Sequence, residues 1–194
     1  MIRNYNIAGF GGQGILYLGQ CLAFAGMLSG KHSTWIPSYG PEMRGGTANC
    51  MVVISSDLIR SPLVYSSDVA IILNQPSLEK YGPGVKTGGA LLYVSELACP
   101  KNPLNGVNLW PIPAKAMAEE LKLPMSMNMI MLGALLTIDP ILSVNEAEEA
   151  IKEITPAHRS QLIEMNIRAL QAGREYIEKE NLAALQPARG RGGG

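Results

Sequence analysis

The segment from residue 9 to residue 14 reads Gly-Phe-Gly-Gly-Gln-Gly and is the clearest candidate for a binding site in this chain. It lies between a strand-like run, residues 5–8, and a helix-like run that starts at Ile15. Glycines allow a tight turn and let a ligand approach the main chain, while the free N–H groups at the start of a helix favour an anion. The segment therefore predicts a backbone cradle for a phosphate group.

A dinucleotide site of this type expects an Asp or Glu about 20 residues further on, to hold the adenosine ribose. The first acidic residue of the chain is Glu42, and the corresponding stretch, residues 31–35, carries no carboxylate. The missing acid disfavours NAD and favours a different phosphate-bearing ligand.

A second candidate is the loop of residues 37–46, Pro-Ser-Tyr-Gly-Pro-Glu-Met-Arg-Gly-Gly. It leaves the second predicted strand, so we expect it near the glycine cluster. Arg44, followed by Gly45 and Gly46, can present a guanidinium and exposed N–H groups to a phosphate or carboxylate. The alternative is a surface turn with solvated Glu42 and Arg44 side chains.

The elements that must position these segments alternate between strands and helices. Strands are predicted at 5–8, 32–36, 47–54, 69–73, 90–94 and 107–110, and helices at 15–29, 114–121, from 143 onward, and 160–180. This order predicts a Rossmann-like, three-layer α/β/α domain with a mostly parallel sheet, C-terminal helices, and ligand sites at the carboxyl ends of the strands. Asn74 follows the strand predicted at 69–73, at its carboxyl end, where its amide can anchor a loop or touch a ligand. We expect one domain, residues 1–186, and a flexible tail, residues 187–194.

The amino-acid composition limits the classes of partner that we expect for this chain. Hydrophobic residues make up 47% of the 194 positions, and 16 basic side chains balance 16 acidic ones. This balance favours neither nucleic acid nor an anionic membrane. The apolar helical run at 15–28 is too short to span a bilayer. The low charge indicates extra buried surface, as in a subunit of a larger assembly.

The three cysteines, Cys21, Cys50 and Cys99, are far apart and form no Cys-x-x-Cys motif. We expect buried free thiols in a reducing cytoplasm, and neither a zinc site nor a self-contained iron–sulfur cluster. Neither a carboxylate pair nor an activated serine emerges, so no catalytic or metal-binding residue is assigned to this chain.

Four stretches together resemble the gamma subunit of the 2-oxoacid:ferredoxin oxidoreductases, in consistent order over roughly residues 5–170. They are Phe10-Gly11-Gly12-Gln13-Gly14, the loop from Ser38 to Thr47, Leu73-Asn74-Gln75, and Asn128-Met129-Ile130-Met131-Leu132-Gly133-Ala134.

The resemblance implies a multi-subunit enzyme that oxidatively decarboxylates a 2-oxoacid to an acyl-CoA and passes electrons to ferredoxin. Alpha, beta and ferredoxin-like companion subunits would hold the thiamine diphosphate and the iron–sulfur clusters, and the gamma chain alone would be inactive. Its domain would border the active site and help bind coenzyme A. A nearby acid would repel the ribose 3′-phosphate of coenzyme A, which agrees with the missing carboxylate. The residues expected to contact or close over the coenzyme are Gly9, Gly11, Gly12, Gln13, Gly14, Tyr39, Met43, Arg44, Gly45, Gly46 and Asn74.

Among substrates, the loop and the length of the chain resemble the 2-oxoglutarate enzymes most, with pyruvate and branched-chain 2-oxoacids next. Two other functions remain open from the residues alone. One is a self-sufficient NAD(P)-dependent dehydrogenase that uses the same glycines, and the other is a non-enzymatic nucleotide-binding module.

Overall fold

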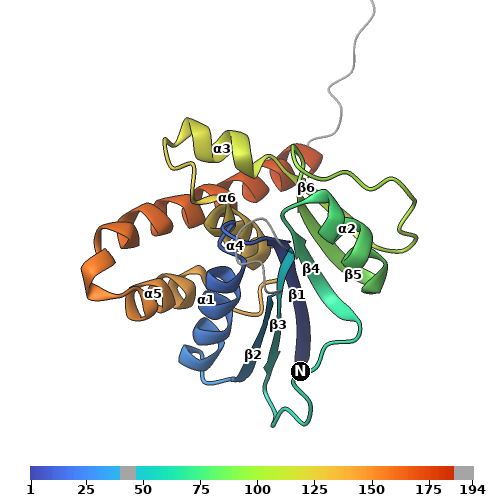
Figure 1. Cartoon of the computed structure of the whole chain (residues 1–194), viewed down its shortest axis with the longest axis horizontal. Coiled ribbons are helices and arrows are strands. Elements are labelled where there is room, and N and C mark those ends of the chain that lie inside the picture. Colours follow the sequence, from blue (N-terminus) through green and yellow to red (C-terminus); the bar gives the residue numbers. More distant parts are fainter. Residues whose placement is uncertain (40–46, 186–194) are drawn as a thin grey trace, which may run out of the picture.

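The computed structural model describes residues 1–39 and 47–185 and contains one mixed sheet with helices on both of its faces (Figure 1). The strands are β1 (Ile2–Phe10), β2 (His32–Tyr39), β3 (Thr47–Ser55), β4 (Ser67–Ile72), β5 (Val85–Val94) and β6 (Asn108–Ile112). The helices are α1 (Ile15–Leu28), α2 (Gln75–Tyr81), α3 (Ala114–Glu120), α4 (Met127–Ile138), α5 (Val144–Ile154) and α6 (Gln161–Leu185), with short 3-10 turns η1 (Gly82–Gly84) and η2 (Ala157–Arg159).

The six strands lie in the order β2-β3-β1-β4-β5-β6. The strands β1, β4, β5 and β6 form parallel neighbours, whereas β3 is antiparallel to both β1 and β2. Residues 40–46 separate β2 from β3, and a segment this short cannot make the crossover that parallel neighbours need. The predicted Rossmann-like, mostly parallel α/β sheet is confirmed, with β3 as its antiparallel strand.

The central strands are apolar because both faces of the sheet are covered. On one face, Ile7, Ile71 and Leu92 belong to the main core, together with residues of α1 and α4. On the other face, Ile72 and Leu91 belong to a smaller core that includes Leu78 of α2. The apolar run of residues 69–73 is therefore a central strand, as its sequence predicts.

The helices on the main-core face lie in two tiers, because α5 packs on α1 and α6 packs on α4 (Figure 1). Residues 128–136 of α4 are all buried. The crossing of α4 and α6 requires two glycines: a Cβ on Gly133 would overlap the Leu170 carbonyl, and one on Gly173 would overlap the Ile130 carbonyl. The helices α2 and α4 were not predicted as helices from the sequence.

Two local predictions have different outcomes. The capping box at Ser143 is confirmed, since Ser143 Oγ accepts from the Glu146 amide at 3.2 Å and the Glu146 carboxylate accepts from the Ser143 amide at 2.6 Å. The expectation of buried thiols holds for Cys21 and Cys50 but is wrong for Cys99, which is exposed on the connection that follows β5. Within residues 1–39 and 47–185, no helix has both the length and the apolar character needed to cross a bilayer.

Candidate functional site

The glycine segment, residues 9–14, forms a tight turn between the carboxyl end of β1 and the start of α1. The main-chain N–H of Gln13 donates to the Phe10 carbonyl at 3.2 Å. Gly12 has φ +96° and Gly14 has φ +76°, in the left-handed region that other L-residues enter at a cost. The sequence therefore needs glycine at these two positions to make this turn, which we call the glycine turn.

The side chain of Gln13 holds the glycine turn against β4. Its Oε1 accepts from the Phe10 amide at 2.6 Å, and its Nε2 donates to the Leu73 carbonyl at 3.1 Å. A Cβ on Gly9 would lie 2.7 Å from Gln13 Oε1 and 3.1 Å from the Cβ of Leu73. Gly9 and Gln13 thus shape the turn, and both ends of the Gln13 amide are already hydrogen-bonded within the chain.

A hollow of about 650 Å³ opens beside the glycine turn, between α1, the start of α4 and the connection from α5 to α6. We call it the α1–α4 hollow. Its size lies in the range of small-molecule and cofactor sites. Its lining residues are Gly12, Gly14, Tyr17, Gln20, Leu123, Pro124, Met125, Ser126, Asn128, Ile154, Thr155, Pro156, Arg159, Leu162, Met165 and Asn166.

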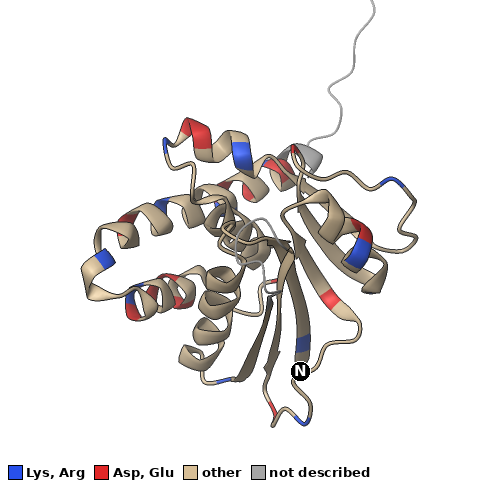
Figure 2. Cartoon of the chain, in the orientation of Figure 1, with Lys and Arg blue, Asp and Glu red and all other residues tan. Residues whose placement is uncertain are grey.

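The charge around the α1–α4 hollow suits an anion. Among the described residues that line it there is no carboxylate, and Arg159 is the one charged side chain. Figure 2 shows no charged residue along α1 or α4, whereas α5 and α6 carry both signs. The helix α1 starts at Gly14 without a side-chain cap, so the N–H groups of its first turn remain available to a bound anion.

The wall opposite the glycine turn is fixed by Tyr17. Thr155 Oγ1 donates to the Ile151 carbonyl, so the Tyr17 hydroxyl donates to Thr155 Oγ1 at 2.9 Å. Asn166 Nδ2 donates to the same Tyr17 hydroxyl at 3.3 Å. Burial raises the pKa of Tyr17, and the nearby Cys21 thiol adds to the rise. The phenol therefore stays neutral and joins α1 to α5 and α6.

Comparison with known proteins gives the family of the chain. Residues 4–176 match the family model described as pyruvate ferredoxin/flavodoxin oxidoreductase. The chain belongs to this family. It is 37% identical over 182 residues to the 2-oxoglutarate synthase subunit KorC of Methanocaldococcus jannaschii, a match that covers 92% of this chain and 96% of the relative.

Other relatives in this oxidoreductase family are longer. The ketoisovalerate oxidoreductase subunit VorA of Methanothermobacter thermautotrophicus is 41% identical over 177 residues, which are 91% of this chain but 36% of VorA. The chain therefore spans about a third of that relative.

Solved structures of the oxidoreductase family share the fold. The keto/oxoacid ferredoxin oxidoreductase gamma subunit from Geobacter sulfurreducens has a TM-score of 0.78 at 28% identity, over 91% of this chain and 99% of that one. The 2-oxoglutarate:ferredoxin oxidoreductase from Magnetococcus marinus, described with 2-oxoglutarate, coenzyme A and succinyl-CoA bound, has a TM-score of 0.82 at 26% identity. That match covers 92% of this chain and 31% of the Magnetococcus chain. The resemblance to gamma subunits read from the four sequence stretches is confirmed.

The structure brings some of the residues predicted for this oxidoreductase site together. Gly12 and Gly14 line the α1–α4 hollow. Asn74 does not: it is 3% exposed, and its Oδ1 accepts from the Ser77 amide at 2.9 Å and so caps α2. Of the two roles considered for Asn74, the observed contact is the anchoring one.

The second predicted segment is described only in part. Tyr39 ends β2, where its backbone pairs with Ala48. Its side chain lies outside the described residues. So do the expected contacts Met43, Arg44, Gly45 and Gly46.

Sequence reasoning missed the rest of the lining of the hollow. Ser126, Asn128, Thr155 and Arg159 belong to it, although none of them was assigned a role. One signal was present, because Asn128 is the one polar residue in the apolar run 127–136. A lone buried amide needs a partner, and here Asn128 Nδ2 donates to the Gly14 carbonyl at 3.1 Å.

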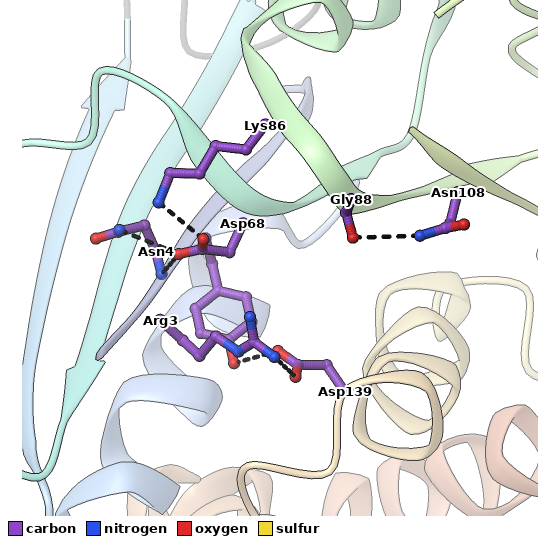
Figure 3. A network of polar contacts seen from close by, with 8 residues as sticks. Arg3, Asn4, Asp68, Lys86, Gly88, Asn108 and Asp139 are labelled. Atoms are coloured by element: carbon purple, nitrogen blue, oxygen red, sulfur yellow. Dashed lines mark hydrogen bonds and ion pairs between the residues drawn. The ribbon is translucent and has the colours of Figure 1, made fainter. Parts of the chain in front are cut away.

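A smaller polar hollow of about 180 Å³ lies toward the amino ends of the strands and is lined by residues of β1, β4, β5 and β6. Figure 3 shows polar contacts among residues around it. Its carboxylates are paired. Asp139 Oδ1 lies 3.2 Å from the Arg3 guanidinium, and Asp139 Oδ2 accepts from the Tyr5 hydroxyl at 2.9 Å. Asp68 Oδ1 lies 2.7 Å from Lys86 Nζ. The Asp139 contacts fasten the start of β1 to the end of α4, and the Asp68–Lys86 pair joins β4 to β5. Among the described residues, no cluster of His, Cys, Asp and Glu could hold a metal ion.

Proposed function

We propose that this chain is the gamma subunit of a complex that oxidatively decarboxylates a 2-oxoacid to an acyl-CoA with ferredoxin as electron acceptor. In this proposal, alpha, beta and ferredoxin-like subunits hold the thiamine diphosphate and the iron–sulfur clusters, and the complex is cytoplasmic. The near full-length likeness to a KorC subunit and to a solved gamma subunit supports it.

The α1–α4 hollow is the observation that carries the coenzyme A role. The hollow joins a glycine turn, an uncapped helix start and a lining without described carboxylates, which together fit the phosphates of coenzyme A. A family relative has coenzyme A bound. We assign Gly11, Gly12 and Gly14 to direct contact, and Gly9 and Gln13 to the shape of the turn. We also propose that Tyr39, Met43, Arg44, Gly45 and Gly46 complete the crevice.

For the substrate we favour 2-oxoglutarate, followed by pyruvate and branched-chain 2-oxoacids. Several relatives that match along most of their length are 2-oxoglutarate synthase subunits, from Methanocaldococcus jannaschii and Methanothermobacter species. The VorA relative is named for ketoisovalerate, and its identity to this chain is slightly higher.

The test is to purify the complex by a tag on this chain and to assay CoA-dependent viologen reduction with 2-oxoglutarate, pyruvate and 2-oxoisovalerate. We expect activity in the complex, none in the isolated chain, and the highest kcat/KM for 2-oxoglutarate. A fully active preparation that lacks this chain would contradict the subunit role. Tight calorimetric binding of NAD(H) or NADP(H) by the isolated chain would instead favour the dehydrogenase alternative.

The replacement Arg44→Ala tests the second segment. We expect a higher KM for CoA with a nearly unchanged KM for the 2-oxoacid, because a guanidinium that binds phosphate does not contact the 2-oxoacid. Arg168→Ala is the control, since Arg168 is exposed on α6. If both constants remain unchanged in Arg44→Ala, Arg44 is not part of the coenzyme site.

A further inference from the structure

A second helix start opens into the α1–α4 hollow. Ser126 is the N-cap residue of α4, yet its side chain makes no capping hydrogen bond. The Met129 amide, which an N-cap serine normally binds through Oγ, donates instead to the Ser126 carbonyl at 3.0 Å. Ser126 is 5% exposed and lines the hollow. Among the described residues, the Ser126 hydroxyl makes no hydrogen bond, and the residue borders the cavity.

The helix starts of α1 and α4 are held beside each other. Asn128, in the first turn of α4, donates through Nδ2 to the carbonyl of Gly14, the N-cap residue of α1, at 3.1 Å. Each helix start carries unsatisfied N–H groups and about half a positive charge. Two such ends on one cavity favour the same kind of guest, an anion with several acceptor oxygens.

The remaining side chains of the hollow agree with this charge. Arg159, at the end of η2, is exposed and lines the hollow, and it forms no ion pair with another described residue. A carboxylate guest offers two acceptor oxygens, whereas a phosphoryl group offers three to donors that approach from different sides. Donors here come from the start of α1, the start of α4 and Ser126, so a phosphoryl group matches them better.

We propose that the α1–α4 hollow contains a phosphoryl-binding subsite in which the Ser126 hydroxyl and the first-turn amides of α4 bind the phosphate from one side. The first-turn amides of α1 bind it from the other side, and Asn128 positions the two helix starts. The assignment of coenzyme A as the carrier of this phosphate rests on the proposed function. A free nucleotide or inorganic pyrophosphate offers the same chemistry.

The test is calorimetric binding to the full chain and to the purified complex, with three probes: CoA, pantetheine, which lacks phosphate, and inorganic pyrophosphate. The key variant is Ser126→Asp, because aspartate is a good N-cap residue but places a negative charge at the phosphate position. We expect the melting temperature to stay the same or rise, while the affinities for CoA and pyrophosphate fall about tenfold or more. Pantetheine affinity should be the same in the variant and the wild type.

Two further variants complete the design. Ser126→Ala removes the donor without adding charge, and we expect a loss of about three- to tenfold for both phosphate probes. Ser66→Ala is the matched control, since Ser66 is exposed and outside the hollow.

The outcomes separate the two proposals. Unchanged CoA and pyrophosphate affinities in Ser126→Asp overturn the subsite, even if Arg44→Ala still raises the KM for CoA and so supports the proposed function. Pyrophosphate binding that is lost in Ser126→Asp supports the subsite, even if the complex shows no CoA-dependent activity and the proposed function fails. An equal loss of pantetheine in Ser126→Asp also overturns the subsite, because it points to a general distortion of the hollow.

Discussion

The side-chain Nδ2 of Asn128 donates to the main-chain carbonyl of Gly14 at 3.1 Å and joins the start of α4 to the glycine turn across 114 positions of sequence. The other end of α4 is also held, because Asp139 accepts from the Tyr5 hydroxyl and pairs with Arg3, both near the start of β1. The helix α4 therefore runs antiparallel to β1 and is fastened to that strand's neighbourhood at both ends. The shape of the candidate phosphate site thus depends on a helix far away in sequence.

The contact between Gly14 and Asn128 gives a first prediction. Gly14→Ala should lower the free energy of unfolding more than Gly12→Ala, although both residues have positive φ. The left-handed backbone costs each variant about 1–2 kcal/mol. At Gly14 the new Cβ also collides with the Asn128 amide, whereas at Gly12 no atom lies within 4 Å. Urea unfolding followed by circular dichroism measures the difference.

Asn128→Ala provides the control for that collision. Alone it should cost about 1 kcal/mol, from the lost hydrogen bond. Combined with Gly14→Ala it should cost less than the sum of the two single changes, by about 1 kcal/mol, because the clash partner is gone. Strict additivity would show that the two residues do not interact as the geometry requires.

The sheet and its central strand follow from local sequence, whereas only part of the candidate site does. Apolar runs such as residues 69–73 identify strands because burial on both faces demands them. The glycine turn was also visible, since φ +76° at residue 14 requires glycine. The rest of the lining is different: Ser126, Thr155 and Arg159 are ordinary residues in their local context, and only the folded chain places them in one hollow with Gly14. Their role comes from long-range packing, which periodicity and spacing do not encode.

The helix α4 shows the same limit in another way. Its residues 128–136 are buried on every side, so the run has no polar face that would reveal a helical period. The apolar pattern around Met129 and Met131 is therefore equally compatible with a strand and with a helix. The helix α2 was missed because it is short, although its N-cap Asn74 was noticed for a different reason.

The close crossing of α4 and α6 gives a second prediction. Gly133→Ala and Gly173→Ala should each destabilise the fold by about 2–3 kcal/mol, because the added methyl meets a main-chain carbonyl that cannot rotate away. Helix propensity alone would predict a gain of about 1 kcal/mol. Gly26→Ala, in α1, is the control: its nearest neighbours are side-chain atoms at 3.3 Å or more. A stabilised Gly133→Ala variant, measured by thermal unfolding, would rule out this helix contact.

The network at the start of β1 gives a third prediction (Figure 3). Asp139→Ala should cost about 2–3 kcal/mol, because it leaves the buried Tyr5 hydroxyl and the partly buried Arg3 without their acceptor. Tyr5→Phe should cost about 1 kcal/mol. Asp57→Ala is the matched control, since that carboxylate is 85% exposed and pairs with the N-terminal ammonium.

Urea unfolding followed by circular dichroism measures these costs. The free energy of unfolding of Asp57→Ala should lie within about 0.5 kcal/mol of the wild-type value. The double variant Tyr5→Phe/Asp139→Ala should be less destabilised than the sum of the single variants, because the two lose one shared hydrogen bond. Equal costs for Asp57→Ala and Asp139→Ala would contradict the network.

The buried thiols predict how stability depends on pH. Burial raises the pKa of both Cys21 and Cys50 to about 12, from an ordinary value of 9.0. A group whose pKa is higher in the folded state stabilises the fold fully below its unfolded pKa and loses that contribution as the pH rises. The free energy of unfolding should therefore be flat near pH 8 and fall above about pH 9, by about 1.4 kcal/mol per pH unit for each ionising thiol. Burial also raises the pKa of Tyr5, which steepens the fall above pH 10.

Urea midpoints at pH 8.0, 9.5 and 10.5 measure this dependence of the free energy of unfolding on pH. Cys99→Ser should keep it, because Cys99 is exposed, whereas Cys21→Ala should reduce it by one group. A slope that Cys99→Ser reduces as much as Cys21→Ala does would show that burial of Cys21 is not its cause.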